Sequence, residues 1–303
     1  MLGETVDDQQ LTRRARGLAA AIEPVAGQVY FSPECHANYE ALGFGPSPGD
    51  FNGVAGPEME SYFCSRGSVM GQVPGSVISA AFGVFNHAMV ERIVERGWAK
   101  TDAPTICQAR DDGAVAQLRR VLGDRPDGVD EARTLLARAN ADLEPYGKPL
   151  YAGLAALDRF DDPLADCWRL ADRLREYRGD AHIAAWTSAE LDACQIGVLS
   201  ELYWGLPARS YSRTRMWSDE QYDAAEAALE ARGLLADHQL TDDGRAFREE
   251  IEVVTDRGCR PIVEALGDDV DALTSTLGRW GASVRDARGY PASGPHDLAD
   301  AAT

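Results

Sequence analysis

Apolar residues recur at helical spacing wherever a pattern can be counted in this chain, and continuous β-branched runs of the kind that form strands are missing. Between residues 77 and 97, for example, Val77, Ala81 and Val84 share one helix face, and Gly97 fits the end of that helix. The sequence therefore predicts a mainly α fold.

Capping residues place two further helices. Asp162 followed by proline is typical of a helix start, which predicts a helix over 164–178 that ends at Gly179. Thr187 and Glu190 have the spacing of a capping box, which predicts that another buried helix begins there. Glycine- and proline-rich stretches that are typical of loops lie at 43–57, 123–128 and 145–149.

The charge of the chain limits its partners. The 303 residues carry a net charge of -19, and 30 of them are basic; such a chain repels phosphate backbones unless its arginines cluster. No apolar run reaches the roughly 18 to 20 residues that a bilayer span needs, and the N-terminus lacks a signal-peptide pattern. We expect a cytoplasmic protein without membrane contact. Its six cysteines form no C-x-x-C pair, which fits reduced, packed thiols.

Residues 217–257 resemble the end of a winged helix of the multiple-antibiotic-resistance regulator type. The resemblance lies in a helix that ends in the run 229–234, a short wing, and the run 240–245 that opens the next helix. In such folds Gly233 ends the recognition helix and Thr241 caps the next helix, and general capping rules support both positions.

Short runs in the first half of the chain echo runs in the second half. The echoed runs are 30–34 with 186–190, 95–98 with 231–234, and 111–113 with 242–244. Two interpretations stand side by side: an internal duplication with units near 24–122 and 180–256, or chance similarity between alanine-rich helices. If the duplication is real, a pocket between the two halves is the natural place for a ligand.

The predicted fold is mainly α, with two helical units and a degenerate winged helix at the C-terminal end. The predicted parts are an N-terminal helical unit (1–125), a helical connector (126–178), a winged-helix-like unit (179–284) and a disordered tail (285–303).

Several segments carry a resemblance that spans most of the chain. They are Tyr30-Phe31-Ser32-Pro33-Glu34, Arg66 with Met70-Gly71, Phe85-Asn86, Arg178-Gly179-Asp180-Ala181-His182, and Trp217-Ser218 through the Arg232-Gly233-Leu234 turn. In these segments the chain resembles an actinobacterial family with a C-terminal helix-turn-helix. The resemblance implies a fold rather than a particular chemistry.

The charge of the winged-helix segment bears on DNA binding. Residues 217–257 contain twelve acidic residues against four arginines, a balance of -8. A groove-entering helix with this sign repels phosphate, so the balance disfavours duplex DNA as a partner. Arg209, Arg213 and Arg215 form a basic cluster just upstream, which keeps DNA binding open as an alternative.

The run 178–182 is the strongest candidate for chemistry in the second half. We expect it at a helix end, where Asp180 would accept a hydrogen bond from one ring nitrogen of His182 and leave the other nitrogen as a base. The alternative is structural: Asp180 caps a helix and Arg178 forms an ordinary ion pair.

In the first half, Arg66 lies among aromatic, sulfur and glycine residues, a composition typical of a pocket wall, where it could bind a carboxylate or phosphate. The alternative is an ordinary ion pair. Asn86 and His87 border an apolar helix face, so we expect them, with Arg66, to face the pocket that His182 lines. The candidate ligand-binding residues are Tyr30, Arg66, Asn86 and Arg178, and the candidate catalytic residues are His87, Asp180 and His182.

Metal binding has only weak candidates. His36 and Glu40 are four residues apart, as are His87 and Glu91, so on helices each pair shares a face. Such spacing is common by chance, and we predict no metal site. A nucleophile elbow, a Walker loop and a G-x-G-x-x-G sequence are also missing, so no cofactor can be assigned.

Together these features predict a small-molecule-binding protein, in first place an enzyme of specialised metabolism with a polar pocket between its two halves. The alternative is a ligand-responsive transcriptional regulator that binds DNA through the C-terminal winged helix. For either function we expect an acidic small-molecule ligand and a homodimer.

Overall fold

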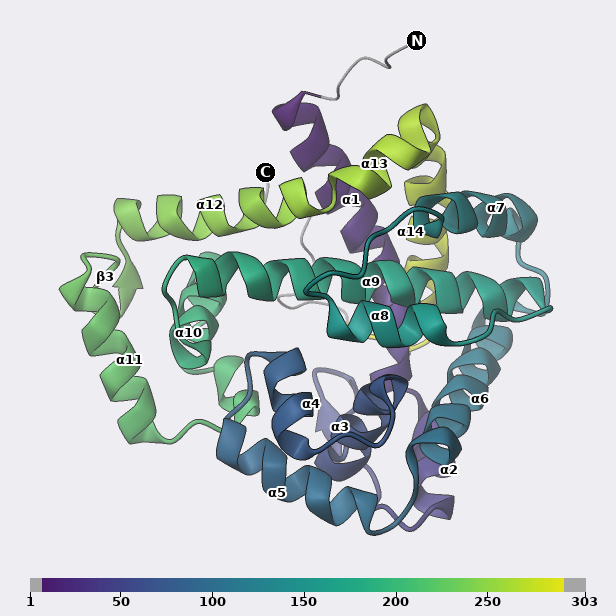
Figure 1. Cartoon of the computed structure of the whole chain (residues 1–303), viewed down its shortest axis with the longest axis horizontal. Coiled ribbons are helices and arrows are strands. Elements are labelled where there is room, and N and C mark those ends of the chain that lie inside the picture. The colour runs from purple at the N-terminus through teal and green to yellow at the C-terminus, as the bar shows by residue number, and fades with distance from the viewer. Residues whose placement is uncertain (1–6, 292–303) are drawn as a thin grey trace.

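The computed structural model describes residues 7–291 and is mainly helical (Figure 1). The elements of the first half are α1 (Asp8–Gly27), η1 (Gln28–Tyr30), α2 (Pro33–Ala41), β1 (Asp50–Phe51), β2 (Val54–Ala55), α3 (Met59–Gly67), α4 (Gly75–Phe82), α5 (His87–Trp98), α6 (Ala103–Leu122), α7 (Val129–Asn140) and α8 (Pro149–Ala156). Those of the second half are α9 (Pro163–Ser188), α10 (Ala193–Tyr203), η3 (Ser212–Arg215), α11 (Asp219–Ala231), β3 (Leu235–Ala236), β4 (Gln239–Leu240), α12 (Asp242–Gly258), α13 (Arg260–Leu266) and α14 (Val270–Asp286). The predicted fold class is confirmed.

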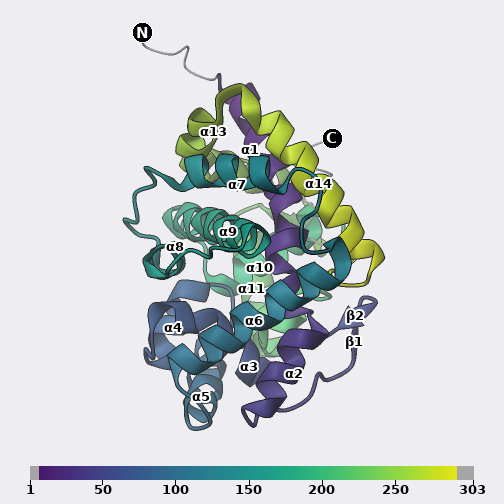
Figure 2. The same cartoon turned by 90° about the vertical axis from the view of Figure 1, so that its right-hand side faces the viewer.

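Helix α9 is the centre of the molecule. It packs against α1, α7, α8 and α12, and Figure 2 shows it end-on with other helices around it. Its apolar side is completely buried: Cys167, Trp168 and Ala171 have no exposed surface. Burial of this kind stabilises a helix far more than its intrinsic propensity does.

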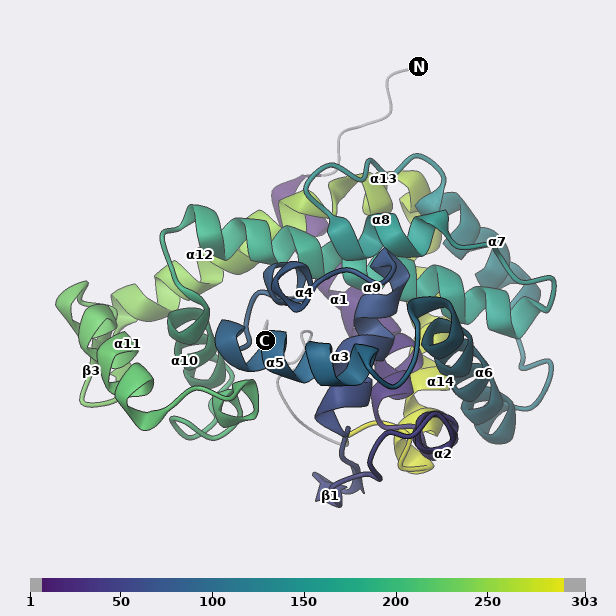
Figure 3. The ribbon, with the colours of Figure 1, turned by 60° about the horizontal axis from the view of Figure 1, so that its bottom comes forward.

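Three apolar clusters make up the core. The largest joins α1, α2, α6, α7, α9, α13 and α14, the second joins the end of α9 to α10, α11 and α12, and the third joins α3, α4, α5 and α8. In Figure 3, α4 and α5 lie between α10–α11 on one side and α2–α6 on the other. Helices α10, α11 and α12 therefore share a core of their own with the end of α9 and also adjoin the N-terminal helices.

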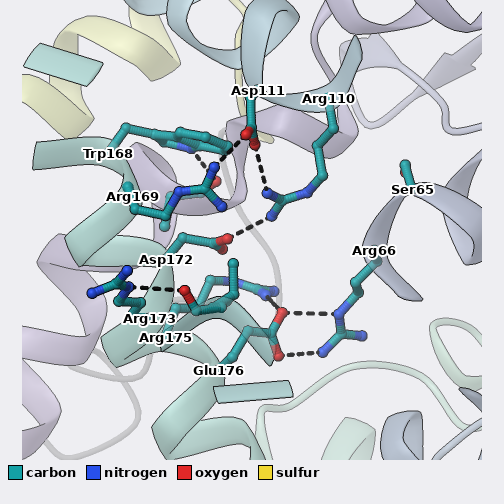
Figure 4. Close-up of polar contacts among 12 residues, drawn as sticks. Ser65, Arg66, Arg110, Asp111, Trp168, Arg169, Asp172, Arg173, Arg175 and Glu176 are labelled. Carbon is teal, nitrogen blue, oxygen red and sulfur yellow. Dashed lines mark hydrogen bonds and ion pairs between the residues drawn. The ribbon is translucent and has the colours of Figure 1, made fainter. Parts of the chain in front are cut away.

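Buried ion pairs attach α9 to its neighbours. Asp172 of α9 accepts a hydrogen bond of 2.5 Å from Arg110 of α6, and Arg169 donates to Asp111 of α6. Figure 4 shows these pairs in a row with the pair between Glu176 and Arg66 of α3. Paired charges and hydrogen bonds offset the desolvation that each buried ion would otherwise suffer.

The helix predicted between residues 77 and 97 is wrong in one respect, because two helices occupy this stretch. Helices α4 and α5 are separated at Gly83, whose φ is +72°. A side chain at this position would begin 3.0 Å from Ile183 and 3.1 Å from Trp186 of α9. The positive φ of Gly83 ends α4 and favours glycine, and the close approach of α9 leaves little room for a side chain there.

The predicted boundary between the next two helices is also wrong. Gly179 lies inside α9, which continues to Ser188 because Ala181, Ala185 and Trp186 extend its buried face. The Thr187 hydroxyl donates back to carbonyls of α9 instead of capping a new helix. Helix α10 begins later, at a capping box that Asp192 forms with Gln195.

In two of the three pairs of echoed runs, the two members occupy different positions in the fold. Asp111-Asp112-Gly113 lies in the interior of α6, whereas Asp242-Asp243-Gly244 forms the first turn of α12. In the other pair, Ser32 caps the start of α2, whereas 186–190 covers the end of α9. These runs do not mark equivalent positions in the two halves.

The start of the predicted tail is ordered. Helix α14 continues to Asp286, and Tyr290 is buried, with its ring perpendicular to that of Phe31. Residues 292–303 lie outside the described residues. Among the residues that the structure describes, no helix is both long and apolar enough to cross a membrane.

Candidate functional site

Helices α10, α11 and α12 and the β3–β4 hairpin lie together at one end of the molecule (Figure 1). Tyr222 and Leu229 of α11 are completely buried against this core. As predicted, α11 ends just before Gly233, and Thr241 caps α12 through a hydrogen bond from the Gly244 amide. The hairpin turn consists of Asp237 and His238, both with positive φ, as a two-residue hairpin turn of the I′ type requires.

The start of α11 is tied to the N-terminal helices. Ser218 and Gln221 form a capping box at the start of α11, and the Gln221 side chain also accepts a hydrogen bond of 3.0 Å from Asn86. The Trp217 indole donates to the Val84 carbonyl at 3.1 Å, and the Asn86 amide donates to the Arg215 carbonyl at 2.9 Å. The loop between α4 and α5 therefore fixes where α11 begins.

Arginines from outside residues 217–257 neutralise much of the acidic charge of that segment. Arg16 of α1, Arg178 of α9, and Arg209 and Arg213 of the α10–α11 connection all form ion pairs with it. Their partners are Asp219, Asp223, Glu226, Glu249, Glu252 and Asp256. A count over consecutive residues misses these tertiary pairs, so it overstates the charge that this end of the molecule presents.

A cavity of about 470 Å³ lies between the N-terminal helices and the segment that leads into α11. Tyr62 and Arg66 of α3 and Tyr30 of η1 line one part of it, and residues 211 and 213–216 line another. Aromatic rings make up much of the wall: Tyr62 lies edge-on to Tyr30 at 5.2 Å between ring centroids and 5.8 Å from Phe85. The size is that of a pocket for a small organic molecule.

Glu176 is the anionic centre behind this wall. Its carboxylate accepts hydrogen bonds from Arg66 at 2.7 and 2.9 Å, from Arg175 at 2.8 Å and from the Tyr30 hydroxyl at 3.3 Å. Burial by itself would raise the pKa of Glu176, but the two guanidinium groups outweigh it and lower the pKa to about 2. Arg66 and Tyr30 thus line the cavity, but Arg66 already has a carboxylate partner.

His182 lines a second, smaller cavity of about 210 Å³, together with Arg66, Arg178 and Glu252. The Thr255 hydroxyl donates to the Ile251 carbonyl, so it accepts from the His182 Nδ1–H at 3.0 Å. This leaves Nε2 of His182 as the unprotonated nitrogen. Burial lowers the pKa of His182 to about 3, which keeps the imidazole neutral.

The predicted hydrogen bond between Asp180 and His182 is absent. Two residues apart on one helix, the two side chains point in nearly opposite directions. Asp180 accepts a hydrogen bond from the backbone amide of Tyr151 in α8 at 3.0 Å. Thr255, rather than Asp180, is the hydrogen-bond partner of His182. Arg178 forms the ion pairs of the structural alternative, with Glu252 at 2.9 Å and Asp256 at 3.0 Å.

Asn86 and His87 line neither cavity. His87 is 64% exposed and lies 3.4 Å from Glu91, so this pair is a surface contact. His36 is buried and its Nε2 donates to the Tyr30 carbonyl at 3.0 Å, while Glu40 is exposed. Within residues 7–291 no group of three or more His, Cys, Asp or Glu side chains could hold a metal ion.

The sequence analysis missed Arg175, Glu176 and Tyr211 as site residues and assigned Arg215 to a cluster facing DNA. A signal was present in α9, where charged residues recur every three or four positions and so share one helix face. These residues are Asp166, Arg169, Asp172, Arg173, Glu176 and Asp180, and all are buried. A polar stripe at helical spacing is also typical of a solvent-facing helix side, and its burial here follows from the helices that pack around α9.

No curated protein and no solved structure matches the chain. A family model described as a helix-turn-helix family matches residues 15–291. The match overturns the prediction that disfavoured duplex DNA as a partner, because the helix-turn-helix is a DNA-docking motif. The charge argument failed because it omitted the arginines that pair with this segment from elsewhere in the chain. The chain belongs to this helix-turn-helix family.

Proposed function

We propose that this protein is a ligand-responsive transcriptional regulator that binds duplex DNA through α10, α11 and the β3–β4 wing. One observation carries the proposal: the segment that lines the 470 Å³ cavity, from Tyr211 to Met216, leads directly into α11. A molecule in the cavity therefore touches the residues that set the position of the proposed recognition helix. The family match supports this alternative better than the enzyme that the sequence analysis put first.

Two exposed arginines are suited to contact the DNA backbone. Arg232 follows the C-terminal end of α11, and Arg245 lies in the first turn of α12, on either side of the wing. Neither pairs with an acidic side chain among the described residues. Arg232 lies over Phe247 and donates to the Ala189 and Glu190 carbonyls, and Arg245 lies over Tyr203. Phosphate contacts of this kind position a protein on DNA without reading its sequence.

We also propose that the protein acts as a homodimer. A symmetric pair of recognition helices reads two half-sites about 34 Å apart along the duplex. Duplexes selected from a random pool should accordingly be enriched in inverted repeats.

The test is selection of duplexes from a random pool, followed by fluorescence anisotropy of the best duplex across a range of salt concentrations. Wild-type protein should bind, with an affinity that falls as salt rises. The double variant Arg232→Ala/Arg245→Ala should bind about ten-fold more weakly or worse, with a salt slope reduced by about 2.

The matched control is Arg279→Ala, since Arg279 is an exposed arginine of α14 whose side chain, within residues 7–291, donates only to Ser275 and Thr276. It should bind DNA like wild type. Failure of the wild-type protein to bind any selected duplex would contradict the proposal, as would equal binding by all three proteins.

A further inference from the structure

We propose that the 470 Å³ cavity binds an aromatic acid, and that Arg215 holds its acidic group. The inference deepens the proposed regulator, on which its regulatory consequence rests, while the binding itself stands on the cavity alone. The sequence analysis gave the anion-binding role to Arg66, and the structure moves that role to a different arginine.

The arginines of the cavity wall differ in their partners. Arg66 pairs with Glu176, Arg175 with Glu23 and Glu176, and Arg213 with Asp219. Arg215 also lines the cavity, but it pairs with no acidic side chain among the described residues. Among the described arginines of the wall, Arg215 is thus the one that forms no ion pair.

Aromatic contacts orient Arg215. Its guanidinium lies over the rings of Phe85 and Tyr211, 4.6 Å from each centroid, and donates one hydrogen bond to the Tyr211 hydroxyl. A guanidinium has five N–H donors in a planar fork that matches the two oxygens of a carboxylate or sulfonate. Arg215 is therefore held in place with donors left over, as an anion site requires.

The rest of the wall suits an apolar, ring-containing body. Tyr62 and Phe85 belong to a cluster of aromatic rings that continues into the core of α3 and α4, and Phe31 stacks on Phe51 at 6.0 Å. Rings of this kind bind flat apolar molecules by stacking and edge contacts. Because Arg215 is the arginine of this wall without an acidic partner among the described residues, we place the acidic group of the ligand there.

Ligand contact at Arg215 would act directly on α11. The Arg215 carbonyl accepts the hydrogen bond from the Asn86 amide, and the Trp217 indole two residues later binds the Val84 carbonyl. A ligand that moves Arg215 strains both bonds and so shifts the first turn of α11 relative to α5.

The test uses two fluorescent probes with the same aromatic skeleton. Anilinonaphthalene sulfonate carries an anionic group, and phenyl naphthylamine lacks it. Both should bind wild-type protein in the absence of DNA. Arg215→Gln should weaken the sulfonate about ten-fold, the loss of one charge-assisted contact, and should change the affinity of the neutral probe less than two-fold.

The matched control is Arg92→Gln, since Arg92 is an exposed arginine of α5 outside the cavity lining; it should leave both probes unchanged. Arg215→Lys keeps the charge without the planar fork and should give an intermediate affinity for the sulfonate, which keeps the test valid if the glutamine variant does not fold. Equal weakening of the two probes, or no weakening of the sulfonate, would overturn the proposal.

Adding the sulfonate probe to the protein–DNA complex separates this inference from the proposed function. Arg215-dependent probe binding without any DNA binding would leave the ligand site standing and remove the regulator. DNA binding without Arg215-dependent probe binding would do the reverse.

Discussion

Asp180 is a carboxylic acid buried between α8 and α9, with only 2% of its surface exposed. One oxygen accepts from the Tyr151 amide, and the other has no hydrogen-bond partner. Burial raises the pKa of Asp180 from 3.8 to about 7. The folded protein therefore favours the neutral acid at a pH where the unfolded chain carries the carboxylate.

The variant Asp180→Asn tests this environment. The neutral form of Asp180 stabilises the fold fully below about pH 4, and this contribution is lost as the pH rises through about 7. The asparagine variant never ionises, so its free energy of unfolding should match wild type near pH 4 and exceed it by on the order of 1 to 4 kcal/mol at pH 8.5. Urea denaturation at both pH values measures this, and a difference that does not change with pH would contradict it.

At the scale of single residues, the sequence predicted which segments matter better than which way their side chains point. The segment 178–182 does border a cavity through Arg178 and His182. It was assigned to a helix end, however, whereas it lies inside α9, and this error placed Asp180 beside His182. The direction in which a side chain points depends on its position around the axis of the whole helix α9. Local capping patterns carry no information on that position.

At the scale of elements, Arg209 joins three parts of the proposed winged helix. It comes from the connection between α10 and α11 and pairs with Glu226 of α11 at 2.7 Å, while His238 of the wing contacts the same carboxylate at 2.8 Å. Glu226 is only 4% exposed. The hydrogen bond from Arg209 lowers the pKa of Glu226. One buried carboxylate thus fixes the wing against the proposed recognition helix.

Removing this arginine should loosen the wing. Arg209→Met leaves Glu226 buried with His238 as its remaining partner, and we expect a loss of about 2 to 4 kcal/mol in the free energy of unfolding. Because Glu226 is charged above its ordinary pKa of 4.5, the loss should shrink at lower pH.

Chemical denaturation of Arg209→Met at pH 7 and pH 4 provides the measurement. The matched control is Arg213→Ala, which breaks the exposed pair with Asp219 and should cost less than about 1 kcal/mol. If the two variants lose the same stability, Arg209 has no special role in the winged helix.

The elements that the sequence predicted well are those with strong local signals. Helix α11, the short wing and the Thr241 cap of α12 all follow from capping residues and turn glycines. The break between α4 and α5 was missed because apolar residues continue at helical spacing across it. Gly83, whose φ is +72°, ends α4, and a glycine inside an apolar periodic pattern does not by itself show whether the helix stops.

At the scale of the whole molecule, ion pairs along α9 connect the halves of the chain. The pair between Arg110 of α6 and Asp172 of α9 is the most deeply buried of these, with both side chains at most 1% exposed. Two nitrogens of Arg110 have no hydrogen-bond partner. Incomplete hydrogen bonding indicates that the pair contributes more to the arrangement of α6 on α9 than to net stability.

This interpretation distinguishes single from double substitution. Asp172→Ala leaves the buried Arg110 without its closest partner and should cost about 3 to 5 kcal/mol. The double variant Arg110→Met/Asp172→Leu removes both charges and should recover more than half of that loss. Urea denaturation of both gives the comparison, with Arg125→Ala, which breaks an exposed pair with Asp130, as a control near zero. A double variant less stable than Asp172→Ala would reject the interpretation.

The net charge of -19 was the least reliable guide to the partner of this protein, because a count along the sequence leaves out tertiary ion pairs. Charge counted along the chain treats each segment as if it faced solvent alone. In the folded molecule, arginines from α1 and α9 meet acidic residues of α12 that are distant from them in the sequence. Which surface remains acidic is a property of the tertiary pairing.

The continuity of α9 also limits the motions with which the molecule can respond to a ligand. It is a single helix of 26 residues, about 39 Å long, held by ion pairs near its start and by α12 near its end. A continuous helix held at both ends gives the two halves of the molecule no hinge about which to close. Domain closure of that kind takes microseconds to milliseconds. Movement is left to the connection between α10 and α11, whose rearrangement is that of a loop, in nanoseconds to microseconds. We therefore expect the release of ligand, rather than any motion of the protein, to set the time for which the proposed regulator stays switched.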